Sequence, residues 1–80
     1  MWLLEYSREA NNYAIDSHPY NEDVLSAIET LALTDMALPP NSTELEPEVY
    51  LWRVEGHLVI YKRRLFPIRS IWIAIIKPTD

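Results

Sequence analysis

Four side chains in the C-terminal half combine the residue types that acid–base or phosphate chemistry needs: Arg53, His57, Tyr61 and Lys77. A histidine titrates near neutral pH and can pass a proton. An arginine can hold a phosphate group through two parallel hydrogen bonds, and a lysine can hold one as a point charge. A metal-free ribonuclease needs little more, because it must stabilise a charged transition state and move a proton. We therefore take Arg53, His57 and Lys77 as the candidate catalytic residues.

Each of these residues also has a purely structural interpretation. A histidine in a hairpin is usually a turn residue, and an aromatic residue at alternate positions of a strand usually packs in the core. An arginine at a strand edge usually lays its stem on the surface and keeps its charge in water. The chemical and the structural interpretation both stay open.

Other kinds of site are excluded by composition. The chain has one glycine, so a glycine-rich loop that binds phosphate is impossible. It has no cysteine, and its two histidines lie in unrelated contexts, so a structural zinc site is not expected. The sequence therefore predicts no cofactor and no metal ion.

The net charge of −5 is unevenly distributed along the chain. Residues 1–48 hold a single base, Arg8, whereas residues 49–80 hold the other six of the seven bases. One interpretation is that two solvated faces differ in sign. The other is a basic surface for a target or partner, built by the cluster Lys62, Arg63, Arg64 and Arg69. The acidic total argues against non-specific nucleic-acid binding, which depends on cations that neutralise phosphates.

The first half of the chain predicts one strand and two helices. Trp2–Tyr6 is rich in strand-forming residues and has the features of a strand rather than of a signal peptide. Ser7 is a natural N-cap for a short helix that must end before Pro19. Asn21 is expected to cap a second helix, and the two helices should pack as an antiparallel hairpin. The second helix has an apolar stripe at helical spacing, formed by Val24, Leu25, Ile28, Leu31 and Ala32.

The second half predicts an irregular loop and then three strands. Residues 34–47 contain three prolines and an Asn-Ser-Thr cluster, which is typical of a loop. We expect strands over Val49–Val54, Leu58–Lys62 and Ile71–Ile76, the first two joined by Glu55-Gly56-His57. The last strand is apolar on both faces, as a central strand is. It is far too short to cross a bilayer, so we expect a cytoplasmic protein that does not bind a membrane.

These elements predict one α+β domain over residues 1–80, in the order β-α-α-β-β-β. The helical hairpin should pack on one face of a four-stranded, mainly antiparallel sheet, because nothing else can cover the apolar stripe of the second helix. The other face of the sheet keeps some of the apolar and aromatic strand residues without a helix to cover them, which suggests a partner or a homodimer.

The segment Leu51–Tyr61, LWRVEGHLVIY, and the strand that ends in Ile75-Ile76-Lys77 resemble the RelE/ParE superfamily of toxin–antitoxin toxins. Glu5–Ala10 also resembles the opening strand and serine-capped helix of that family. The resemblance implies a small toxin domain that an antitoxin neutralises. Its target would be either mRNA on the ribosome or DNA gyrase. By the same resemblance, Arg53 matches a basic position on the second strand, and Lys77 lies near a basic position after the last strand. Tyr61 matches a largely structural tyrosine.

The chain departs from the family pattern in four ways. Leu58 stands where a basic residue is usual, and His57 stands at the aromatic position of the turn. The basic, tyrosine-bearing tail is absent after Lys77, and the chain is acidic. These departures favour binding over catalysis. We therefore expect a toxin-like component that binds a cellular target and an antitoxin. The alternatives are a non-toxic, degenerate interaction or regulatory protein and a metal-free endoribonuclease that cleaves mRNA.

Overall fold

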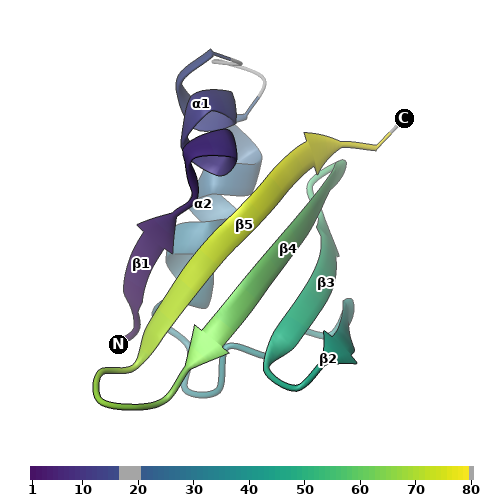
Figure 1. Cartoon of the computed structure of the whole chain (residues 1–80). Helices are drawn as coiled ribbons and strands as arrows, with labels where there is room; N and C mark the ends of the chain where they lie inside the picture. Colours follow the sequence, from purple (N-terminus) through teal and green to yellow (C-terminus); the bar gives the residue numbers. More distant parts are fainter. Residues whose placement is uncertain (17–20, 80) are drawn as a thin grey trace.

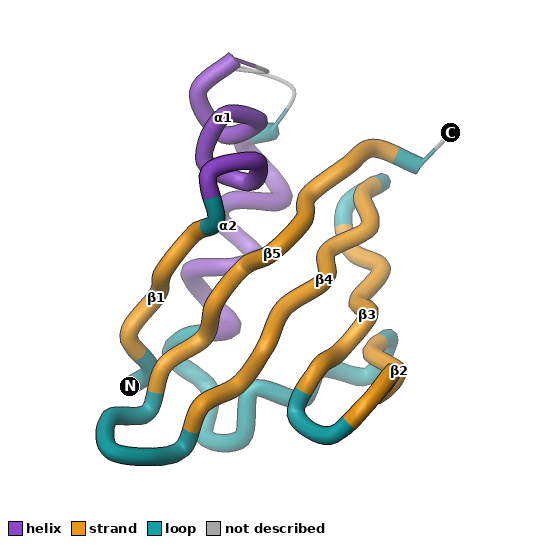
Figure 2. Tube along the Cα trace, in the orientation of Figure 1, coloured by secondary structure: helices purple, strands orange, loops and turns teal. Residues whose placement is uncertain are grey.

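The computed structural model describes residues 1–16 and 21–79. Two helices lie on the same side of a five-stranded sheet (Figure 1), and Figure 2 shows the same arrangement by element type. The α+β class and the helical hairpin on one face of the sheet are confirmed, whereas the predicted number of four strands is wrong. In chain order the elements are β1 (Leu3–Tyr6), α1 (Arg8–Asp16), α2 (Glu22–Leu31), β2 (Ser42–Glu46), β3 (Val49–Val54), β4 (His57–Arg64) and β5 (Ser70–Pro78).

The strands are arranged in the order β1-β5-β4-β3-β2. β1 pairs with β5 in parallel, and the other three pairings are antiparallel. β5 therefore lies between two strands, in agreement with its apolar residues on both faces. Among the described residues, no helix is long and apolar enough to cross a membrane.

The additional strand, β2, lies inside the segment that the sequence predicts to be a loop. Its residues pair with β3 in antiparallel register, with Thr43 opposite Leu51 and Glu44 opposite Tyr50. β2 is an edge strand, and all of its side chains except Ser42 are exposed. Edge strands commonly carry charged residues, which discourage pairing with other chains. The two prolines before β2 and Pro47 after it leave room for a strand of this length.

Ser7 and Asn21 connect the helices to their surroundings. The Oγ of Ser7 accepts a hydrogen bond from the amide of Ala10 at 3.0 Å, so the predicted cap of α1 is confirmed. Asn21 occupies the cap position of α2, but its side chain makes no capping bond. Instead, its amide group donates to the carbonyl oxygens of Tyr13 and Ala14, at 3.1 and 2.6 Å. It therefore ties the end of α1 to the start of α2.

The core lies between the helices and the sheet. Val24, Ile28 and Leu31 of the predicted stripe are buried there, together with core residues of β4 and β5. Burying one such side chain completely contributes about 1.5–3 kcal/mol. A register shift in β5 lets Ile73 and Ile76 both face the helices, since Tyr61 pairs with Ile73 while Ile60 pairs with Ile75. The helices cover only this face of the sheet.

Candidate functional site

The face of the sheet opposite the helices, here called the open face, carries an apolar strip. Leu51, Ile60 and Ile75 form one row across β3, β4 and β5. All three side chains are half-buried, although neither helix covers them. Trp72, further along β5, is 44% exposed. Figure 1 shows this face toward the viewer, with α2 behind β5. An uncovered strip of this kind is typical of an interaction surface.

Four cations lie at the two ends of this strip. Arg53 and Lys77 flank Leu58 in one row, about 10 Å apart across two strand spacings. Lys62 and Arg64 lie toward the other end of β4, four or more residues and about 13 Å further along. All four side chains are exposed. Within residues 1–16 and 21–79, none of them forms an ion pair or a side-chain hydrogen bond.

A hollow of about 380 Å³ lies at the second end of the strip. Lys62, Arg64, Ser70, Trp72 and Glu5 line it. The register explains this grouping, because Glu5, Trp72 and Lys62 form one row across three strands. Glu5 is the one carboxylate among the lining residues, so cations predominate in the hollow.

His57 lies on the other face of the sheet and is 7% exposed. Its Nδ1 lies 2.8 Å from the carbonyl oxygen of Glu55, and its Nε2 lies 2.6 Å from the hydroxyl of Tyr13. A carbonyl oxygen only accepts, so in the neutral ring Nδ1 carries the proton and Nε2 accepts from Tyr13. The structure thus brings Arg53 and Lys77 onto one face and keeps His57 on the opposite one. The three candidate catalytic residues do not form one site.

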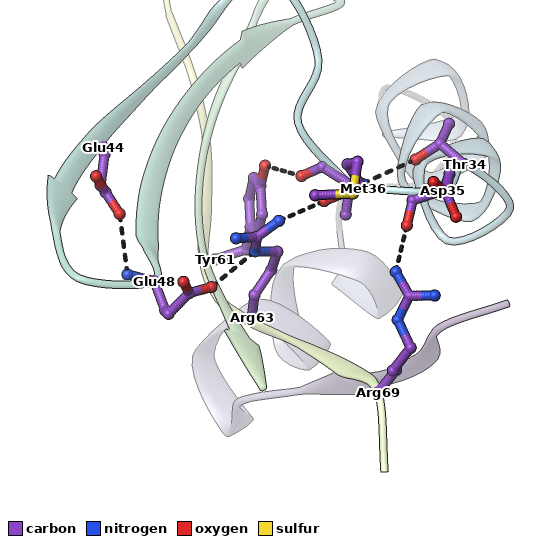
Figure 3. A network of polar contacts seen from close by, with 9 residues as sticks. Thr34, Asp35, Met36, Glu44, Glu48, Tyr61, Arg63 and Arg69 are labelled. Atoms are coloured by element: carbon purple, nitrogen blue, oxygen red, sulfur yellow. Dashed lines mark hydrogen bonds and ion pairs between the residues drawn. The ribbon is translucent and has the colours of Figure 1, made fainter. Parts of the chain in front are cut away.

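Arg63 points to the helix side and is 7% exposed. It donates to a carboxylate oxygen of Glu48 at 2.8 Å and to the carbonyl oxygen of Met36 at 2.6 Å (Figure 3). Its guanidinium carbon also lies 5.9 Å from the ring centre of Trp2 and 5.3 Å from that of Tyr50. The hydrogen bond to Glu48 raises the pKa of Arg63 above its usual value. These contacts join the turn before β3 to the segment after α2.

Arg69 is used in the same way. It donates to the carbonyl oxygen of Asp35 (Figure 3), and its guanidinium carbon lies 4.2 Å from the centre of the Trp2 ring. Of the four cations predicted to bind a target or partner, Lys62 and Arg64 therefore lie on the open face. Arg63 and Arg69 are engaged within the chain. The pairing of Arg53 and Lys77 with Leu58 places these two cations on the open face as well.

Tyr61 is fully buried under the helices. Its hydroxyl donates to the carbonyl oxygen of Ala37 at 2.7 Å (Figure 3). Burial, with a smaller contribution from Tyr50, raises the pKa of Tyr61 to about 12. Such a hydroxyl stays protonated near neutral pH, which favours a structural role.

The sequence predicted apolar residues on the face away from the helices, but Leu51, Ile60, Ile75 and Trp72 were not among the predicted site residues. Their signal was the alternation of side chains along β3 and β4, which places Leu51 with Arg53 and Ile60 with Lys62. Within the described residues, no group of three or more histidine, aspartate or glutamate side chains lies close enough together to hold a metal ion.

Comparisons with known proteins identify no relative of this chain. No family model matches the sequence, and neither a curated protein nor a solved structure is significantly similar to it.

Proposed function

We propose that this chain is the toxin-like component of a bacterial toxin–antitoxin pair, and that it acts by binding its target through the open face. The observation that carries the proposal is the set of four exposed cations, none in an ion pair within the described part of the chain, around a half-buried apolar strip. An antitoxin would neutralise the chain by covering the same face. The assignment to a toxin–antitoxin pair rests on the resemblance of Leu51–Tyr61 and of the last strand.

The open face selects a partner with an apolar centre and acidic groups around it. Leu51, Ile60 and Ile75 gain from being removed from water, at about 25 cal/mol for each Å² of apolar surface. The cations at both ends attract and orient carboxylates, because complementary charge speeds association and fixes the binding register. This mixture suits a protein surface better than a nucleic-acid backbone, whose phosphates need cations but no apolar strip.

The same face of a second copy is a poor partner. Stacking two open faces would bring four exposed cations of each copy together, against Glu5 and Glu46, the two carboxylates in the row of Lys62. Like charges in an interface are destabilising and act against such pairing. The partner is therefore a different, acidic protein.

The order of the elements supports the proposal. A strand and two helices precede the remaining strands, as in the order β-α-α-β-β-β that the resemblance implies. β2 is an addition to that order. The endoribonuclease alternative has less support, because both ring nitrogens of His57 are hydrogen-bonded away from Arg53 and Lys77. Nδ1 donates to the backbone carbonyl oxygen of Glu55, and Nε2 accepts from the hydroxyl of Tyr13.

Induced expression in a bacterial host without an antitoxin tests the proposal. We expect growth to stop with the native chain. It should recover with the fourfold variant Arg53→Glu, Lys62→Glu, Arg64→Glu, Lys77→Glu, because these changes reverse the charge of the open face. The matched control is Arg8→Glu, which reverses an exposed cation on α1 and should leave the chain toxic. Immunoblots and circular dichroism check that all chains are present and folded.

Three outcomes separate the alternatives. Normal growth with the native chain at equal abundance would remove the toxin assignment and favour the non-toxic interaction protein. Growth arrest that the fourfold variant retains would place the binding surface elsewhere. If an Arg53→Ala, Lys77→Ala double variant stays fully toxic, the endoribonuclease alternative is excluded.

A further inference from the structure

β1 is an edge strand, and within residues 1–16 and 21–79 it pairs with β5 on one side and with no strand on the other. The amides of Leu3 and Ser7 donate to the carbonyl oxygens of Arg69 and Ile73, both at 2.9 Å. The backbone N–H groups of a strand point to its two sides in turn. The amides of Leu3 and Ser7 point toward β5, so those of Leu4 and Tyr6 point away from it. Unpaired groups of this kind can pair with another chain.

Exposed apolar side chains gather next to this edge. Met1 is 89% exposed, Leu33 69%, Ile68 63% and Leu3 53%. These four residues help to line a hollow of about 630 Å³, which we call the β1 surface. The hollow combines the N-terminal strand, the end of α2 and the loop before β5. Its other lining residues are Trp2, Leu4, Glu29, Ala32 and Arg69.

The side chains that line the β1 surface carry no net charge. Among these side chains only those of Glu29 and Arg69 ionise, and their charges are opposite. The chain as a whole has a charge of −5, and the open face is cationic. Two copies of the chain repel each other through their net charge, and this repulsion disfavours their contact least where the surface is neutral and apolar. Neither an acidic nor a basic partner gains from charge at this surface.

We infer that the β1 surface is the contact between two copies of this chain. In a twofold dimer the same surface faces itself, so each residue pair occurs twice. This symmetry allows the two β1 edges to run antiparallel and Glu29 of one copy to approach Arg69 of the other. The contact covers the exposed leucine, isoleucine and methionine side chains and leaves the apolar strip of the open face uncovered. It uses none of the open-face cations, but it adjoins them, because Leu3 lies in one row with Ser70 and Arg64. Its test therefore measures the oligomeric state and not toxicity.

Sedimentation equilibrium of the full chain at micromolar to submillimolar concentration tests the inference. We expect a species of twice the 9.4 kDa chain mass. The Leu3→Glu, Ile68→Glu double variant should be monomeric, with the dissociation constant raised at least about 100-fold by two buried charges in each copy. The matched control is Ile15→Glu on α1, where the native side chain is 66% exposed outside the β1 surface. This control should still dimerise.

A cysteine variant locates the contact without relying on a loss of binding. The chain has no cysteine, so Leu33→Cys introduces a single thiol into the β1 surface. Under mild oxidation this variant should form a disulfide-linked dimer, whereas Ile15→Cys should not. A native chain that stays monomeric over the whole concentration range would overturn the inference. So would a dimer that survives the Leu3→Glu, Ile68→Glu changes.

Discussion

Two consecutive arginines of β4 have opposite roles, and this difference can be measured. Arg63 is buried and bonded to Glu48 and Met36, whereas Arg64 is exposed on the open face. We expect Arg63→Ala to lower the free energy of unfolding by about 2–3 kcal/mol, because hydrogen bonds from a charged donor are lost and a buried carbonyl loses its partner. Arg64→Ala should change it by less than about 0.5 kcal/mol. Urea unfolding of both variants provides the comparison.

A conservative variant distinguishes the geometry of Arg63 from its charge. Arg63→Lys keeps the positive charge but has no planar group that can reach Glu48 and Met36 together while lying near two rings. It should therefore restore only a small part of the lost stability. Equal unfolding midpoints for Arg63→Ala and Arg64→Ala would show that the network contributes nothing.

The side of the sheet on which Arg63 lies was not deducible from its neighbours. A strand expected to end at Lys62 assigns Arg63 to an exposed turn. β4 instead continues to Arg64, and alternation then turns Arg63 to the same side as Tyr61 and His57. Its acceptors lie 15 and 27 residues earlier in the chain, on Glu48 and Met36. No local pattern in the sequence indicates hydrogen-bond partners that lie so far away along the chain.

The β3–β4 hairpin is strained at its first turn residue. Its loop is Glu55-Gly56, with φ values of 50° and 69°. Positive φ at both positions is the requirement of a two-residue type I′ turn, in which Asn-Gly is favoured. Glu55→Asn should therefore raise the free energy of unfolding by roughly 0.5–1 kcal/mol. Gly56→Ala should lower it by about 1 kcal/mol, although no atom lies within 4 Å of the added Cβ.

The control for this hairpin is Glu55→Gln, which removes the charge and keeps a side chain that disfavours positive φ. It should leave the stability near that of the native chain. Thermal unfolding followed by circular dichroism gives all three values. If Glu55→Gln stabilises the chain as much as Glu55→Asn does, the gain comes from charge, and backbone strain is not its cause.

Elements with strong local signals were predicted well, and the one without such a signal was missed. β3 is found at its expected bounds, the serine cap located α1, and apolar periodicity located α2. β2 has the sequence STELE, which is polar and follows two prolines. It becomes a strand because the edge of β3 offers hydrogen bonds to it, and that tertiary cause leaves no periodic apolar pattern in the segment.

For the whole molecule, charge along the chain differs from charge on the surface. The sequence correctly separates an acidic from a basic half. Folding then divides the basic half, since four of its cations lie on the open face while Arg63 and Arg69 contact residues within the chain. The candidate site was therefore predicted in part, through Lys62, Arg64, Arg53 and Lys77. Its apolar strip depends on which face the helices leave uncovered.

The core makes the stability of the whole fold sensitive to alkaline pH. Burial raises the pKa of Tyr6, Tyr50 and Tyr61 above the usual 10.0, to about 12 for Tyr61. Above pH 10 the unfolded chain therefore loses the Tyr61 proton before the folded chain does. The stabilisation is complete below pH 10 and is lost as the pH rises to 12, by about 3 kcal/mol for Tyr61. Urea unfolding between pH 8 and pH 12 measures this loss.

The variant Tyr61→Phe tests whether Tyr61 causes it. This variant should be less stable at pH 8, because the carbonyl oxygen of Ala37 loses its hydrogen-bond donor, and its stability should decline less steeply with pH. Parallel declines for the two chains would contradict the assignment to Tyr61, since lysine titration is common to both.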